Sequence, residues 1–200
     1  VEGPLSNLYG SNAAGGVINL ISKTNSGTGW NLSTDHQIES VGKRQHYLSV
    51  GYKKGNWSAR LYGRLFSFDY TSIDSLRLVE ISELSDGSTV QRSKYPWNPK
   101  DQWNAGAQIG YQWSRQSLRL DGRLNHEDVA DYGQLKRPNY KPYAFDDFYT
   151  TDRRDLALHY KGDIKERIFM DVTLGYNRFD RAYDGLRYEF DQGAYLEEAI

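Results

Sequence analysis

Aromatic side chains gather in two long segments of the chain that carry little period-two patterning. Residues 70–101 contain Tyr95-Pro96-Trp97-Asn98-Pro99, and residues 127–152 contain Tyr140, Tyr143 and Phe145. A long connector that holds rigid aromatics is often a binding loop, because Tyr and Trp combine a large apolar area with one polar group. We therefore take Tyr95, Trp97, Tyr140 and Tyr143 as candidate ligand-binding residues. The alternative is that these rings pack their own loops onto the neighbouring strands.

The other reactive side chains give little support for catalysis or metal binding. Asp146 and Asp147 could hold a calcium ion, although a solvated acidic loop is the simpler interpretation. The 4 His show no His-x-x-x-His spacing, so we expect no metal site. The sequence has 0 Cys, no Gly-x-Ser-x-Gly elbow and no carboxylate spacing that would fix two acids across a cleft. We predict no catalytic residue and no cofactor, and hence a protein that is not an enzyme.

Charge and composition exclude further classes of protein. The 25 Lys and Arg balance the 26 Asp and Glu, so no broad basic field is available to bind nucleic acid. Aromatic residues make up 14% of the chain, which excludes ordinary disorder. No stretch approaches the roughly 20 apolar residues of a membrane helix. Low mean hydropathy still allows a membrane barrel, because lipid-facing residues then occupy every second position only.

Seven runs of the sequence alternate apolar and polar residues with a period of two, which predicts β-strands. They are residues 30–37, 45–53, 57–66, 103–113, 118–126, 155–161 and 168–177, and an eighth run near 188–196 is poorly patterned. A slip of one residue in run 118–126 would turn Arg119 and Arg123 to the apolar side. In a bilayer this would cost about 2 to 4 kcal/mol for each Arg near the midplane, so one register is strongly preferred.

The two faces of these predicted strands differ in charge. The apolar positions include no Asp, Glu, Lys or Arg. The charged positions of the opposite face are Asp35, Lys53, Arg60, Arg64, Arg119, Asp121, Arg123, Asp155, Lys161 and Asp171. A face without charge is typical of strands that contact hydrocarbon.

Connector length and the positions of aromatic residues distinguish the two ends of these predicted strands. Residues 53–56, 114–117 and 162–167 form short turns, residues 70–101 and 127–152 form long loops, and residues 38–44 form a modest loop on the long side. Short turns at one rim and long loops at the other are typical of outer-membrane barrels. The aromatics of the apolar face near the short turns are Trp30, Tyr52, Trp57, Trp113 and Tyr160. They indicate a girdle at one water interface, and Trp103 and Tyr176 would begin the second.

Residues 1–23 break the pattern and carry a specific motif. Its elements, in order, are Gly3-Pro4, Leu8-Tyr9-Gly10 and Ala13-Ala14-Gly15-Gly16-Val17-Ile18-Asn19. This segment resembles the end of the plug domain in TonB-dependent outer-membrane receptors, where Gly-Pro, Leu-Tyr-Gly and Ala-x-Gly-Gly-x-Ile-Asn precede the barrel. Glu2 stands where many members carry Arg, a variant associated with receptors of the Bacteroidetes type. By residue type alone, the segment is a packed turn and a buried strand, and it lacks the Lys-Ser/Thr of a phosphate-binding loop.

The resemblance implies the end of a plug domain at residues 1–24 and the N-terminal part of a transmembrane antiparallel β-barrel at residues 25–200. About seven or eight of the family's roughly 22 strands would be present. The family implies uptake of a scarce ligand across the bacterial outer membrane, energised through TonB by a segment upstream of this chain. The expected partners are outer-membrane lipid, the TonB complex and an extracellular small molecule or glycan, of the siderophore, cobalamin, haem or glycan class. The barrel would be monomeric.

Arginines that face the barrel interior allow two interpretations. Arg60, Arg64, Arg119 and Arg123 could line a path for an anionic substrate, or pair with Asp121, Asp155 or carboxylates of the plug, which we favour.

Two other protein classes remain open at this stage. One is a small closed outer-membrane barrel with a structural or adhesive role, and the other is a secreted, sugar-binding β-sandwich. A sandwich would bury its apolar faces against each other and would show no girdle. The chain also opens without a charged start and an apolar leader, which indicates a processed or cropped sequence.

Overall fold

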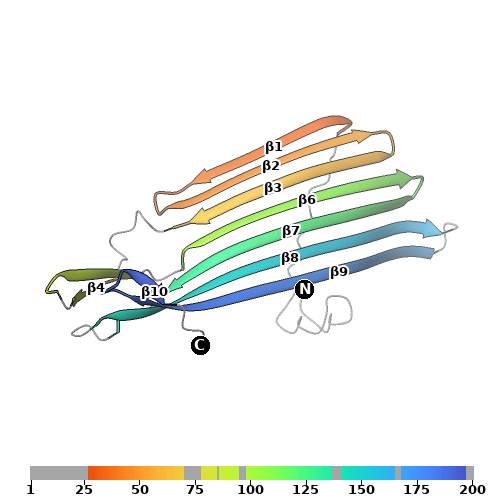
Figure 1. The fold of residues 1–200 in the computed structure, drawn as a ribbon. Helices are drawn as coiled ribbons and strands as arrows, with labels where there is room; N and C mark the ends of the chain where they lie inside the picture. Colours follow the sequence, from red (N-terminus) through yellow and green to blue (C-terminus); the bar gives the residue numbers. More distant parts are fainter. Residues whose placement is uncertain are drawn as a thin grey trace, which may run out of the picture.

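The computed structural model describes residues 27–69, 78–84, 86–94, 98–136, 141–164 and 168–196. Every regular element in these ranges is a β-strand. Eight strands form one antiparallel sheet in the order β1-β2-β3-β6-β7-β8-β9-β10, and β4 and β5 form a separate hairpin. Figure 1 shows the long strands side by side, with the hairpin beyond one end of the sheet. The prediction of an all-β, antiparallel fold is confirmed.

Each of the seven patterned runs lies within a strand. The strands are β1 (Gly29–Ile38), β2 (Lys43–Lys54), β3 (Trp57–Phe68), β4 (Leu78–Glu83), β5 (Thr89–Lys94), β6 (Lys100–Trp113), β7 (Gln116–Tyr132), β8 (Tyr143–Ile164), β9 (Ile168–Glu189) and β10 (Ala194–Leu196). The poorly patterned eighth run becomes the end of β9, a turn and the short β10, which pairs Tyr195 with Tyr188.

The long loop predicted for residues 127–152 is wrong. Strand β7 continues to Tyr132 and β8 already begins at Tyr143, with Glu127 opposite Thr151 in an unbroken ladder. Beyond His126 the apolar side carries polar residues such as Asp128, so the alternation that revealed the strands disappears while their backbone pairing continues. The β8 and β9 strands reach 22 residues each, far more than the 9 to 11 residues that a bilayer requires. The loop predicted for residues 70–101 contains the β4–β5 hairpin.

The register places the predicted apolar positions opposite one another across the sheet. One such row runs Trp30, Tyr52, Ala59, Ile109, Leu120, Leu158, Leu174. We call this side of the sheet the apolar face and the other side the polar face. On the apolar face Leu61 is 64% exposed and Leu174 is 63% exposed, whereas Asp121 on the polar face is 6% exposed. No second layer covers the apolar face in the described part of the chain, which argues against a sandwich.

Aromatic rings follow the apolar face near the short turns. Ring centroids lie 4.8 Å apart in Trp30–Tyr52 and 4.6 Å apart in Trp57–Tyr111, and Trp113 contacts Tyr111 at 5.5 Å. Trp57–Tyr111 lies two residues nearer the short turns than the row that contains Trp30 and Tyr52, and Trp113 lies two residues beyond Tyr111 on β6. This stepwise shift means that the strands are tilted relative to the aromatic band, as they are in barrels.

A glycine on the polar face makes room for a large ring. Gly106 lies opposite Tyr62, and a Cβ at Gly106 would be 2.3 Å from Cζ of that ring. We expect Gly106→Val to expel the Tyr62 ring and to lower the free energy of unfolding by about 1 to 3 kcal/mol, as other overpacking substitutions do. Urea unfolding of the full-length protein in lipid vesicles measures this change. Gly175→Val is the matched control, because nothing lies within 4 Å of the Cβ it would add. Equal midpoints for the two variants would contradict the prediction.

Candidate functional site

On β8 and β9 the uncharged part of the apolar face, which we call the apolar band, ends at Leu156 and Tyr176. Beyond this end the polar face of the two strands carries aromatic and basic residues. The register places Tyr149 opposite Tyr183, Thr151 opposite Arg181 and Arg153 opposite Phe179. We call Tyr149, Arg153, Phe179, Arg181 and Tyr183 the β8–β9 ladder. Phe179 is 57% exposed, Tyr183 is 56% exposed, and Arg153 and Arg181 are exposed too, so ring faces and guanidinium groups are both available to a ligand.

Contacts within the ladder hold its side chains in place. The Tyr149 and Tyr183 ring centroids lie 5.2 Å apart, and the guanidinium carbon of Arg181 lies 4.7 Å from the Tyr149 centroid. The Tyr183 hydroxyl donates a hydrogen bond to Asp147 at 2.8 Å. This hydrogen bond, followed by desolvation, raises the pKa of Tyr183, so the phenol stays neutral. The ladder therefore combines fixed cations with aromatic surface, a combination suited to a ligand that is anionic and planar.

Tyr143 lies at the start of β8 and not in a loop. The guanidinium carbon of Arg187 lies 4.2 Å from the Tyr143 ring centroid, and Phe145 packs edge-on against the same ring at 5.5 Å. Tyr143 shares the polar side with the ladder, because both occupy odd positions of β8. Of the predicted ligand-binding residues, Tyr143 alone falls in the described part of the chain. Tyr95, Trp97 and Tyr140 lie outside the described residues, as do the plug-motif residues Gly3, Pro4, Leu8, Tyr9, Gly10, Gly15, Gly16, Ile18 and Asn19.

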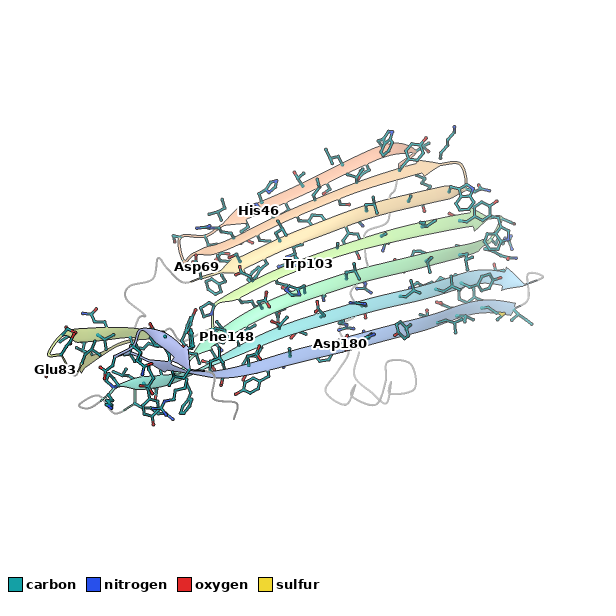
Figure 2. All side chains as sticks on the ribbon, in the orientation of Figure 1. His46, Asp69, Glu83, Trp103, Phe148 and Asp180 are labelled. Carbon is teal, nitrogen blue, oxygen red and sulfur yellow. The ribbon has the colours of Figure 1, made fainter. Side chains whose placement is uncertain are left out.

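Asp146 is fully buried, so the predictions of a calcium ligand or a solvated acidic loop are wrong for it. Its carboxylate pairs with Arg92 of β5 and accepts hydrogen bonds from the Gly133 N–H at 3.0 Å and from the Tyr195 hydroxyl at 2.9 Å. Burial, and then the hydrogen bond to Asp146, raise the pKa of Tyr195. We call Arg92, Gly133, Asp146 and Tyr195 the rim cluster. It joins the β4–β5 hairpin to the long strands, in the crowded region around Phe148 in Figure 2.

Aromatic rings surround the guanidinium of the rim cluster. The guanidinium carbon of Arg92 lies 5.2 Å from the Tyr132 ring centroid and 5.6 Å from the Phe190 ring centroid. Cation–π contacts strengthen when they are desolvated, and the Arg92 side chain is 12% exposed. The Arg92 side chain therefore anchors the hairpin to the long strands.

The arginines of the polar face confirm the predicted charge pairing only in part. Arg119 pairs with Asp121 at 2.7 Å, as predicted. Two further arginines contact neutral oxygens: Arg60 donates to Ser49 and to the Tyr47 hydroxyl, and Arg64 donates to Gln45. Arg123 lies opposite Asp155 but forms no ion pair with it, and Asp155 instead accepts from Arg153 at 3.1 Å.

Histidines occupy the loop end of the apolar face. His36 and His46 approach to 3.0 Å between their Nδ1 atoms, and His126 lies 2.9 Å from Asp152 and 3.0 Å from Asp128. Within the residues that the structure describes, no three His, Asp or Glu side chains converge to bind a metal ion. The same residues include no helix that is long and apolar enough to cross a membrane.

Part of this chain is similar in sequence to a known receptor. The ferrienterobactin receptor of Escherichia coli (strain K12) is 38% identical over 82 residues, which cover 38% of this chain and 10% of that receptor. The chain therefore spans about a tenth of the length of the relative it matches. No family model and no solved structure matches the chain. The similarity supports a relationship with TonB-dependent receptors, and it lends no support to a Bacteroidetes type.

Proposed function

We propose that this chain is part of an outer-membrane receptor that imports a scarce extracellular ligand with energy supplied through TonB. The observation that carries the proposal is the exposed apolar face, which is uncharged over the seven patterned runs and bordered by aromatic rings at the short-turn end. Such a face is suited to contact with the hydrocarbon core of a bilayer. The similarity to the Escherichia coli receptor supports the same function.

The proposal assigns a part to each region of the chain. Residues 1–24 would be the end of the plug, with its structural motif, and residues 25–200 would be the N-terminal part of the barrel wall. The TonB complex would act through a segment upstream of the plug. Long strands that continue past the apolar band would carry the ligand-binding surface outside the cell, and the polar face would line the barrel interior. The protein would act as a transporter and not as an enzyme.

The β8–β9 ladder would contact the ligand. Arg153 and Arg181 attract anions, and the exposed rings of Phe179 and Tyr183 provide stacking surface close to those charges. A ferric siderophore is the first ligand to test because the relative is a ferrienterobactin receptor; cobalamin, haem and glycans are the other classes. Tyr95, Trp97, Tyr140 and Tyr143 remain proposed ligand contacts.

Replacing Arg181 with Gln is expected to weaken ligand binding about 10-fold or more, because a hydrogen bond to a charged group contributes about 1.5 to 3 kcal/mol. Titration of the full-length receptor with its ligand measures the dissociation constant. Arg178→Gln is the matched control: it removes the same charge three residues away on the opposite side of β9. If both variants bind like the parent protein, the ladder is not the ligand site.

Transport itself tests the function. Cells that carry the full-length receptor should accumulate labelled ligand, and cells that lack TonB should bind the ligand at the surface without accumulating it. Equal accumulation in both strains would contradict energised import. A full-length protein that stays in the aqueous phase and monodisperse without detergent would contradict the membrane location.

A further inference from the structure

The charge on the apolar side of β8 and β9 changes sharply where the two strands leave the apolar band. Successive pairs across the strands are Leu158–Leu174, Leu156–Tyr176, Arg154–Arg178 and Asp152–Asp180. Two apolar pairs are thus followed directly by two guanidinium groups. The step from one pair to the next is about 7 Å along the strands.

Arg154 and Arg178 face each other with like charge, an arrangement that disfavours the sheet unless an anion compensates it. The neighbouring carboxylates are already engaged: Asp180 accepts from Arg178 at 2.8 Å, and Asp152 lies 2.9 Å from His126. Arg154 is exposed and forms no hydrogen bond or ion pair within the described segments. Its neighbour on β7 is Leu124, which offers no counter-charge. One guanidinium therefore has no counter-ion among these strands.

We infer that Arg154 and Arg178 bind the phosphate of an anionic lipid in the outer leaflet of the membrane. The inference rests on the proposed outer-membrane location. The planar guanidinium forms paired hydrogen bonds with phosphate oxygens, so Arg154 and the donors of Arg178 that Asp180 does not engage can hold one phosphate between them.

The surrounding residues favour a lipid over a soluble anion. Leu156 and Tyr176 lie directly beside the arginine pair and are half or more exposed, so acyl chains would cover them while the headgroup reaches the arginines. Tyr176 has the amphipathic ring that is common at membrane interfaces. At the other end of the same side, the pairs Tyr160–Val172 and Gly162–Met170 carry no charge. The arginine pair therefore marks one leaflet, the one at the end of the sheet opposite the short turns.

Lipid binding to the full-length receptor in nanodiscs tests this inference. The probe is lipid A with its phosphates, compared with dephosphorylated lipid A and with inorganic phosphate, and native mass spectrometry reports the bound lipid. We expect Arg154→Gln or Arg178→Gln to weaken binding of the phosphorylated lipid about 5-fold and the double variant about 25-fold, as each Arg near an anionic surface contributes independently. Arg123→Gln, which removes an Arg from the polar face of β7, should bind like the parent.

Three results would overturn the inference. These are unchanged affinity in the double variant, equal affinity for the dephosphorylated lipid, and displacement of the lipid by micromolar inorganic phosphate, which would identify a free-anion site. Ligand uptake is measured on the same variants. If the double variant inserts into the membrane, transports ligand and still binds the lipid, only the lipid site is contradicted. If the parent protein does not enter a bilayer, the proposed function is contradicted.

Discussion

Replacing Asp146 with Ala is expected to detach the β4–β5 hairpin from the long strands, at a local cost of about 3 to 5 kcal/mol. The substitution leaves the Arg92 guanidinium buried among the Tyr132 and Phe190 rings without its carboxylate. It also removes the acceptor for the Gly133 N–H and the Tyr195 hydroxyl. Hydrogen exchange of the hairpin amides in residues 86–94 measures the effect, and exchange in β6 should not change.

Two controls separate a lost ion pair from general damage. Asp147→Ala removes the neighbouring carboxylate, which accepts a hydrogen bond from Tyr183 rather than from the hairpin, and should leave the hairpin attached. The double variant Arg92→Met with Asp146→Leu removes both charges and should destabilise the hairpin less than Asp146→Ala alone, because no buried charge stays unpaired. Unchanged exchange in Asp146→Ala would show that the rim cluster does not hold the hairpin.

Replacing Leu158 with Arg is expected to lower the free energy of unfolding in vesicles by about 2 to 4 kcal/mol, the cost of an Arg on the lipid side near the midplane. Leu158 lies between Leu120 and Leu174 in the central apolar row. Ala157→Arg places the same charge one residue earlier, on the polar face. There it lies between Asp121 and Gly175, where nothing occupies the space beside Gly175 within 4 Å. Ala157→Arg should therefore cost little.

The comparison is made by urea unfolding of the full-length protein in vesicles, with tryptophan fluorescence as the readout. A large cost at Leu158 and a small cost at Ala157 identify the apolar face as the lipid face. Similar costs at the two positions would mean that neither face contacts hydrocarbon.

Period two was sufficient to predict the strands inside the apolar band and the direction of their side chains. In residues 103–113, for example, Ala105, Ile109 and Tyr111 all lie on the predicted face and pair with apolar partners on β3. The pattern predicts the strands there because the two faces of the sheet lie in different environments. Outside the band both faces mix polar, aromatic and small apolar residues, so the pattern predicts a loop for residues 127–152 although the ladder continues through them.

The candidate sites were harder to predict. Asp146 and Arg92 are separated by 54 residues and come from different sheets, so no local spacing could connect them. The β8–β9 ladder could have been found by continuing the odd positions of β8 from Asp155 back through Arg153 to Tyr149. The partners of Arg60 and Arg64 depend on the register between strands, which a single strand's pattern does not reveal.

The claim on which the import function depends is that the apolar face contacts lipid and the polar face contacts water. Nitroxide labels placed one at a time at residues 118–125 of β7, in the full-length protein in a bilayer, test it most directly. We predict that accessibility to oxygen peaks at residues 118, 120, 122 and 124, and that accessibility to a water-soluble nickel complex peaks at the positions between them. Accessibility without this alternation, or with the two reagents exchanged, would contradict the account.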